Sequence, residues 1–203
     1  MRLREYIIED IHQTLQYMPN AARLALACMG IYLMIYVIAS IIIWLLHCIF
    51  HMHKDTKDER NKKIMYNIWH MLCCGAFVAY MYMLTMIVYY SRESGSRIGA
   101  IDTQLWSTWG ITLQEHAYFI ENVVLFVPFG FLFPLVFKHL FRWATIPFGC
   151  MISMGIEFLQ LVTGRGYCQL DDIVTNTAGT AIGFFAFLIG YIWWWICQKL
   201  AED

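Results

Sequence analysis

Charged residues are scarce in this sequence. Asp, Glu, Lys and Arg make up 14% of its 203 residues, and hydrophobic residues make up 60%. Soluble domains usually hold about 25% charged and about 45–50% apolar residues. The formal net charge of −1 gives no basis for binding nucleic acid or for adhering to anionic lipid through bulk charge. The composition therefore excludes an ordinary soluble domain and predicts a membrane protein.

Recognisable catalytic and metal-binding motifs are missing as well. The seven cysteines fall mostly in apolar runs, and no two pairs of them have the spacing of a metal site. They are interpreted as small apolar residues, not as a disulfide framework. The chain also lacks a glycine-rich phosphate loop, a serine-hydrolase elbow and a known metal triplet.

The first twenty residues lack the continuous apolar core of a cleaved signal, because charges occur throughout residues 1–20. Apolar residues recur there at helical spacing. This pattern predicts either an amphipathic helix lying in the membrane interface or a helical lead-in packed on the rest of the bundle.

Long apolar runs are what the sequence does have. About 20 apolar residues in a helix cross a bilayer core of roughly 30 Å. Five stretches are candidates, the third of which is short and holds two prolines: 24–46, 68–90, 122–137, 143–163 and 173–197. The tryptophans of the segment 91–121 indicate an interfacial cap, not a free loop. We therefore predict an all-α fold. It is a polytopic transmembrane helical bundle of one domain (1–203), with five spans, an N-terminal amphipathic helix and the cap 91–121.

The basic residues between the spans are unequally distributed. The connection after the first span holds five of them: Lys54, Lys57, Arg60, Lys62 and Lys63. The positive-inside rule then places this connection in the cytoplasm, although Arg2, Arg4 and Arg23 favour the opposite orientation. In either orientation, the start of span three, the end of span four and the start of span five share one side. We expect a multi-pass protein of the cell membrane with that side facing outward.

Polar residues follow one face of each of the last two spans. Span four carries, at offsets of four, four and three, Gly149, Ser153, Glu157 and Gln160. Span five carries, at offsets of four, three and four, Asp172, Asn176, Gly179 and Gly183. Residues at these spacings stack on one helix face, and the small-xxx-small pair of glycines permits close approach of another helix. The two polar faces are expected to meet inside the bundle.

Glu157 is the most costly residue among them. An acid in the middle of a membrane helix costs about 2.5–3.5 kcal/mol on the insertion scale, so such a residue is a candidate for function. The alternative is structural, in which Glu157 pairs with Arg165 and joins two helix ends.

Three segments in this region resemble one known family. They read "NVVLFVPFGFLFP" (122–134), "SMGIEFLQ" (153–160) and "GRGYCQLDDIVTNTAGTAIG" (164–183). They are similar to the VanZ-like integral membrane proteins, over residues 122–183. The positions that match the family pattern are Asn122, Phe126, Pro128, Gly130, Ser153, Glu157, Gln160, Arg165, Asp172, Asn176, Gly179 and Gly183. Asp171 competes with Asp172 for the acidic position, and Asp172 is chosen because it lies four residues before Asn176.

The resemblance implies a protein of the bacterial cell envelope. The namesake of the family is associated with low-level resistance to the glycopeptide antibiotic teicoplanin, and its molecular activity is not settled. A distant relationship of the family to enzymes that act on lipid-linked or phospholipid head groups has been proposed.

An arginine beside two carboxylates and several amides, at a lipid–water boundary, suits a phosphate-bearing head group. We expect Arg165 to bind phosphate oxygens and Glu157 to act as general acid or base. Asp172 would act as a nucleophile or base, or would bind a divalent cation together with Asn176. The residues expected to bind and orient the substrate are Asn122, Ser153, Gln160 and Asn176. The predicted partner is a lipid or lipid-linked substrate, with no nucleic acid.

Other interpretations stay open at this point. The protein could bind or shield a lipid-linked peptidoglycan precursor without chemistry, or it could move a lipid or solute through a polar groove. Movement is disfavoured because the ionisable groups gather at one side, whereas transporter sites lie near the midplane. A metal site among His47, His51, His53 and His70 is permitted by spacing. A solvated helix end is the preferred interpretation, and no metal site is predicted.

Overall fold

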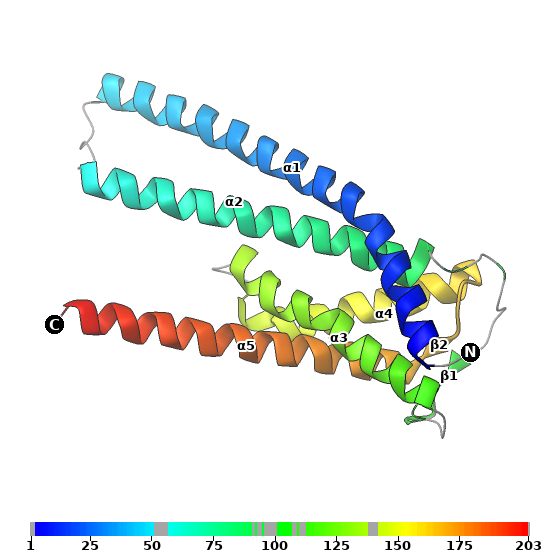
Figure 1. Cartoon of the computed structure of the whole chain (residues 1–203). Helices are drawn as coiled ribbons and strands as arrows, with labels where there is room; N and C mark the ends of the chain where they lie inside the picture. Colours follow the sequence, from blue (N-terminus) through cyan, green and yellow to red (C-terminus); the bar gives the residue numbers. More distant parts are fainter. Residues whose placement is uncertain are drawn as a thin grey trace.

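The structure is a computed structural model, and it describes residues 3–50, 57–90, 92, 95, 101–106, 109, 113–137 and 142–202. Five long helices dominate it (Figure 1): α1 (Leu3–Phe50), α2 (Lys57–Thr85), α3 (Leu113–Val136), α4 (Thr145–Thr163) and α5 (Leu170–Glu202). The shorter elements are η1 (Met86–Tyr90), η2 (Arg142–Ala144), β1 (Ile101–Asp102) and β2 (Cys168–Gln169).

Each long helix, together with η1 after α2 and η2 before α4, provides a stretch that is long and apolar enough to cross a membrane. These stretches are Gln16–Ile42, Glu59–Tyr90, Glu115–Val136, Arg142–Thr163 and Leu170–Leu200. The predicted all-α bundle with five membrane spans is therefore confirmed.

The N-terminal region differs from the expectation of a separate amphipathic helix at 1–20. From Leu3 onward these residues are the first part of α1, which continues through Pro19 into the first span. A proline removes one backbone hydrogen bond and kinks a helix, but good helix formers on both sides allow the helix to continue. The helix bends in its N-terminal part (Figure 1).

The predicted cap 91–121 is also shorter than expected, because α3 already begins at Leu113. Gln114, Glu115 and His116 are polar yet compatible with a helix, so the helix extends beyond the apolar run. Asn122 consequently lies well inside α3 and not at its start. The described parts of the remaining cap include β1, which pairs in parallel with β2.

The closest helix contact lies between α3 and α5, and glycines make it possible. A Cβ added at Gly179 or Gly183 would collide with the backbone carbonyl oxygens of Val123 and Val127 on α3. On α3, a Cβ added at Gly130 would collide with the carbonyl oxygen of Thr180. The predicted small-xxx-small contact is thus confirmed, and its partner is span three. Such close backbone approach is a common way to hold membrane helices together.

A phenylalanine-rich core fills the space between α2, α3 and α4. Its buried residues are Leu84, Val88, Phe126, Phe129 and Phe133. Most other large apolar side chains are exposed on the outer faces of the helices, which suits a protein surrounded by lipid.

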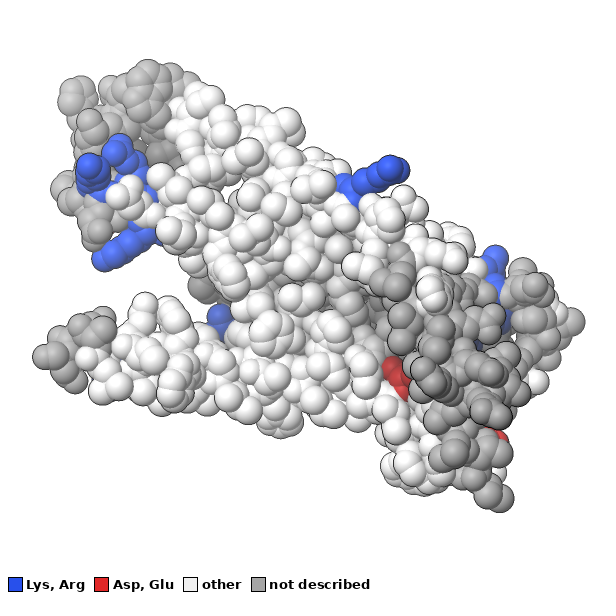
Figure 2. Space-filling model, in the orientation of Figure 1, with Lys and Arg blue, Asp and Glu red and all other residues white. Residues whose placement is uncertain are grey.

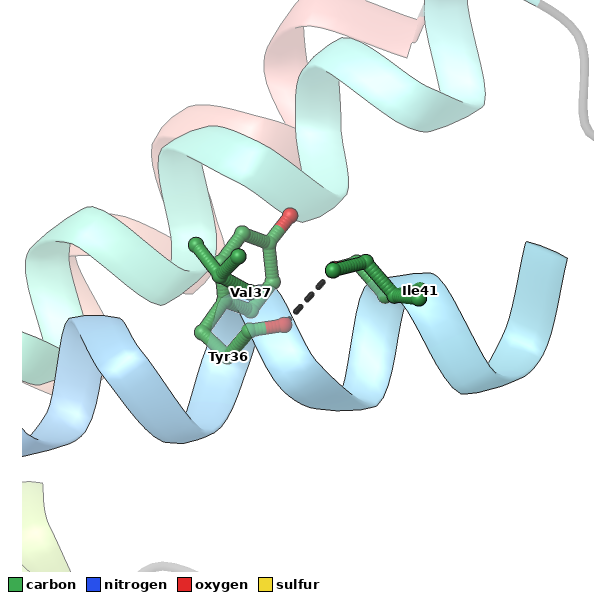
Figure 3. Close-up of a pocket in the computed structure, with 4 residues that line it drawn as sticks. Tyr36, Val37 and Ile41 are labelled. Carbon is green, nitrogen blue, oxygen red and sulfur yellow. Dashed lines mark hydrogen bonds between the residues drawn. The ribbon is translucent and has the colours of Figure 1, made fainter.

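Helix α1 lies along α2 at the edge of the bundle (Figure 1). His70 of α2 joins this pair to the core, since its ring nitrogens lie 3.1 Å from the Tyr32 hydroxyl of α1 and 3.0 Å from the Val136 carbonyl of α3. The outer part of α1 carries a shallow groove lined by Tyr36, Val37, Ser40 and Ile41 (Figure 3). The Ser40 hydroxyl donates to the Tyr36 carbonyl there, at 2.8 Å.

Charged side chains are distributed unevenly along the bundle. Figure 2 shows a group of basic side chains over the start of α2, with further basic side chains along the bundle, and the acidic side chains visible on this face lie at the end away from that group. The first turns of α2 supply Lys57, Arg60, Lys62 and Lys63. The strands β1 and β2 lie at the other end of the bundle (Figure 1).

Candidate functional site

A hydrogen bond joins the third and fifth helices at the centre of the polar region. Nδ2 of Asn122 on α3 donates to Oδ1 of Asp172 on α5, at 2.8 Å. Asp172 is only 8% exposed, so its carboxyl group has lost most of its contact with water. The hydrogen bond from Asn122 compensates for part of that loss. Asn122 and Asp172, which lie fifty residues apart in the sequence, are thus brought together as predicted.

A second contact brings in the fourth helix. Nδ2 of Asn176 on α5 donates to the Ser153 hydroxyl on α4 at 2.9 Å, and that hydroxyl lies 3.5 Å from the carbonyl oxygen of Asp172. Ser153 and Asn176 are both buried. The expectation that the polar faces of spans four and five meet is therefore confirmed.

Glu157 lies one turn beyond Ser153 on α4 and is 2% exposed. Its Oε2 accepts the backbone N–H of Gln169 in β2, at 3.0 Å. The chain returns over Glu157 because Gly164, in the left-handed conformation with φ 62°, ends α4. The parallel pairing of β2 with β1 then holds this return in place. Glu157 therefore bonds to the backbone of β2, where the structural alternative expected a pairing with Arg165.

Gln160 connects α4 to the end of the second span. Its Nε2 donates to the Val88 carbonyl of η1 at 2.9 Å, and its Oε1 accepts from Nη1 of Arg92 at 3.3 Å. Both ends of this buried amide are therefore satisfied, and it fixes the position of η1 beside α4.

Arg165 lies against η1 and not among the carboxylates. Its Nη1 donates to the carbonyl oxygens of Tyr89 and Arg92, each at 3.2 Å. Its guanidinium carbon lies 4.6 Å from the centroid of the Tyr89 ring, a cation–π distance. The role predicted for Arg165 as a phosphate ligand stays a prediction.

Arg92 is a residue that the sequence reasoning missed. It interacts electrostatically with both Glu157 and Asp172. One feature of the sequence could have indicated it: Arg92 directly follows an apolar span, on the membrane side predicted to hold the polar cluster.

The two consecutive acids, Asp171 and Asp172, make different contacts. Oδ1 of Asp171 accepts the backbone N–H of Trp106 at 2.7 Å, so Asp171 holds Trp106 against the start of α5. The Asp172 carboxyl group instead accepts the hydrogen bond from Asn122. The choice of Asp172 for the site stays a prediction.

Cys168 of β2 lies beside the two carboxylates. Its partial burial, together with the negative charges of Glu157 and Asp172, raises the pKa of the Cys168 thiol. A thiol with a raised pKa is held in its protonated, weakly nucleophilic form.

Metal binding has limited support from the donor set. Among the residues that the structure describes, no group of three or more His, Cys, Asp or Glu side chains is arranged to hold an ion. Asp172 and Asn176, four residues apart on α5, are oxygen donors of the kind that divalent cations prefer. Oδ1 of Asn176 is buried without a hydrogen-bond partner among the described residues, so it is available to a donor or a cation.

The histidines do not form a site in the described part of the chain. His70 bridges α1, α2 and α3 as described above, which is a structural role. His51 and His53 lie outside the described residues, as does the side chain of His47.

Comparison with known proteins gives this cluster a context. The sequence profile of the family described as VanZ/LLP1 matches residues 6–193, well beyond the region 122–183 that carries the motifs. Protein VanZ of Enterococcus faecium is 33% identical over 64 residues, which are 32% of this chain and 40% of that protein. No solved structure matches the chain. Since the profile covers most of the sequence, the chain belongs to the VanZ/LLP1 family.

Proposed function

We propose that this protein acts on the phosphate-bearing head group of a lipid-linked cell-envelope intermediate, by transfer or hydrolysis. The observation that carries the proposal is the convergence of polar side chains, most of them buried, from three membrane helices at one end of the bundle. The residues concerned are Asn122, Ser153, Glu157, Asp172 and Asn176. Burying such groups in a membrane helix is costly, and function is the usual reason.

The roles follow from the contacts of each side chain. Glu157 would take the proton of an attacking water or hydroxyl while the phosphorus–oxygen bond to the leaving group breaks. The leaving oxygen would then receive a proton from the same group. Asp172, oriented by Asn122, would bind the nucleophile or a divalent cation. Preorganised groups of this kind lower a barrier without reorganising during the reaction.

The location of the cluster supports an outward-facing site. The basic start of α2 lies at the opposite end of the bundle (Figure 2), and basic connections face the cytoplasm in most membrane proteins. A head group in the outer leaflet would then lie at the depth of the cluster. An outward-facing site also suits the association of the family's namesake with glycopeptide resistance, because glycopeptides act outside the membrane.

The test measures release of inorganic phosphate from a long-chain polyprenyl diphosphate by the purified full chain in lipid nanodiscs. Glu157→Gln should lower the rate by about 10²–10⁴-fold. Folding should persist, because the glutamine oxygen can still accept the Gln169 N–H. The matched control is Glu59→Gln, an exposed acid at the basic end of the bundle. Full activity of both Glu157→Gln and Asp172→Asn would sink the catalytic proposal.

A second candidate is binding or shielding of a lipid-linked peptidoglycan precursor without chemistry. The observation in its favour is that both carboxylates already accept hydrogen bonds from the chain, from Asn122 and from Gln169. A site organised in this way can bind a head group without a free nucleophile. A protein that binds the polyprenyl diphosphate but releases no phosphate, with or without Mg²⁺, would favour this candidate.

A further inference from the structure

The cation best placed to meet a phosphate at this site is Arg92, which the sequence motifs do not include. It follows η1, is half-buried, and reaches α4, where Nη1 donates to Oε1 of Gln160 at 3.3 Å. It lies close enough to both carboxylates of the cluster to interact with them electrostatically. A guanidinium offers five N–H donors. Among the described residues, one of these donors is bound to Gln160, a neutral acceptor at the long distance of 3.3 Å.

The backbone makes room for this side chain at Gly166. A Cβ added at Gly166 would lie 2.7 Å from Nη1 of Arg92 and 3.0 Å from Oε1 of Gln160. The turn between α4 and β2 therefore passes directly against the guanidinium, and a methyl group at this position would displace it. Three parts of the structure therefore determine where Arg92 lies: η1, which precedes it, the Gln160 side chain and the turn at Gly166.

Arg165 has a different task, which is to hold this position. Its Nη1 is bound to the carbonyl oxygens of Tyr89 and of Arg92 itself, and its guanidinium is stacked on Tyr89. It thereby ties the backbone that carries Arg92 to the end of α4. Arg165 is thus a positioning residue, and the charge that faces the cluster comes from Arg92.

We infer that Arg92 binds the phosphate of the head group through N–H groups of its guanidinium, beside Glu157 and Asp172. The inference rests on the proposed function, since it supplies the ligand contact of that same site. The planar guanidinium matches two phosphate oxygens at once. If Arg92 binds the phosphate, the protein should bind a lipid phosphate more tightly than the corresponding lipid alcohol, because the alcohol has no negative charge for Arg92 to bind.

The experiment compares two probes that share one tail: a long-chain polyprenyl phosphate and the polyprenol of the same length. Affinities are measured for the full chain in nanodiscs of neutral lipid. The parent protein should prefer the phosphate by at least about tenfold, which is about 1.4 kcal/mol. Arg92→Gln should abolish this preference, and Arg92→Lys should keep part of it. The matched control is Arg23→Gln, because Arg23 is an exposed cation on α1.

A second variant covers the case in which Arg92→Gln fails to fold. Gly166→Ala keeps every charge but displaces the guanidinium, and it should reduce the phosphate preference several-fold. Gly155→Ala is its control, since a Cβ at Gly155 meets no atom within 4 Å.

The outcomes separate the two proposals. A parent protein without phosphate preference would overturn both the proposed function and this inference. A parent that prefers phosphate, while folded Arg92→Gln or Gly166→Ala keeps the full preference, would overturn the inference alone. Loss of the preference in a folded variant, with both controls unchanged, would support it.

Discussion

The side-chain amide of Asn122 on α3 donates to the carboxyl group of Asp172 on α5 at 2.8 Å, inside the bundle. This bond links the helix that carries the first motif to the helix that carries the last. It lies near the glycine contact of Gly179 with Val123, so the polar bond and the close backbone approach occur together. The glycines bring the two helices near enough for the short Asn and Asp side chains to meet.

The first prediction concerns this bond. Asn122→Leu should destabilise the protein by about 1.5–3 kcal/mol, because the buried Asp172 carboxyl loses a donor that it cannot replace with water. Thermal unfolding of the purified chain in detergent would measure the effect. Val124→Ala is the control, since Val124 lies on the same helix and is 60% exposed. Equal unfolding temperatures for the two variants would show that the bond contributes nothing to stability.

The second prediction concerns the contact between α3 and α5. Gly183→Ala should force the helices apart, because the new methyl group would collide with the Val127 carbonyl oxygen. Overpacking of this kind costs about 1–3 kcal/mol, and the polar cluster should lose ligand binding as well. Gly190→Ala on the same helix meets no atom within 4 Å and should be neutral or slightly stabilising. If the two variants unfold at the same temperature, the glycine contact is not tight.

The third prediction separates the two arginines. Arg165→Gln removes hydrogen bonds to two carbonyl oxygens and a stacked contact with Tyr89. It should lower the unfolding temperature markedly, since hydrogen bonds from a charged donor are worth about 1.5–3 kcal/mol each. Arg92→Gln loses one long bond to a neutral amide and the electrostatic attraction of two carboxyl groups with which no direct bond is formed, so its unfolding temperature should change less. The reverse order of stabilities would contradict the division between a positioning and a binding arginine.

The sequence predicted the convergence of the cluster because helical periodicity determines which residues share a face. Offsets of three and four placed Ser153, Glu157 and Gln160 on one side of α4, and the structure buries all three. The predicted close approach at Gly179 and Gly183 also followed from spacing alone. These features depend on the geometry of single helices, which one sequence reveals.

The directions of side chains after helix ends could not be predicted in the same way. Arg165 is close to Glu157 in the sequence, but the left-handed Gly164 turns the chain between them, and Arg165 lies against η1. Arg92 is positioned at the cluster by Gln160 and Gly166, which are more than sixty residues away in the sequence. Such contacts depend on the packing of the second span against the fourth. No local pattern encodes that packing.

The last prediction concerns the orientation of the chain in the membrane. In a variant whose seven native cysteines are replaced, a single cysteine introduced by Thr103→Cys should react with a membrane-impermeant maleimide added to intact cells. Thr103 is exposed and follows β1, at the end of the bundle that holds the polar cluster. A cysteine introduced by Asn61→Cys, exposed among the basic residues at the start of α2, should react only after the membrane is permeabilised. This pattern is expected because excess Lys and Arg stay in the cytoplasm. Labelling of Asn61→Cys alone in intact cells would reverse the orientation, and the cluster would then meet head groups of the inner leaflet.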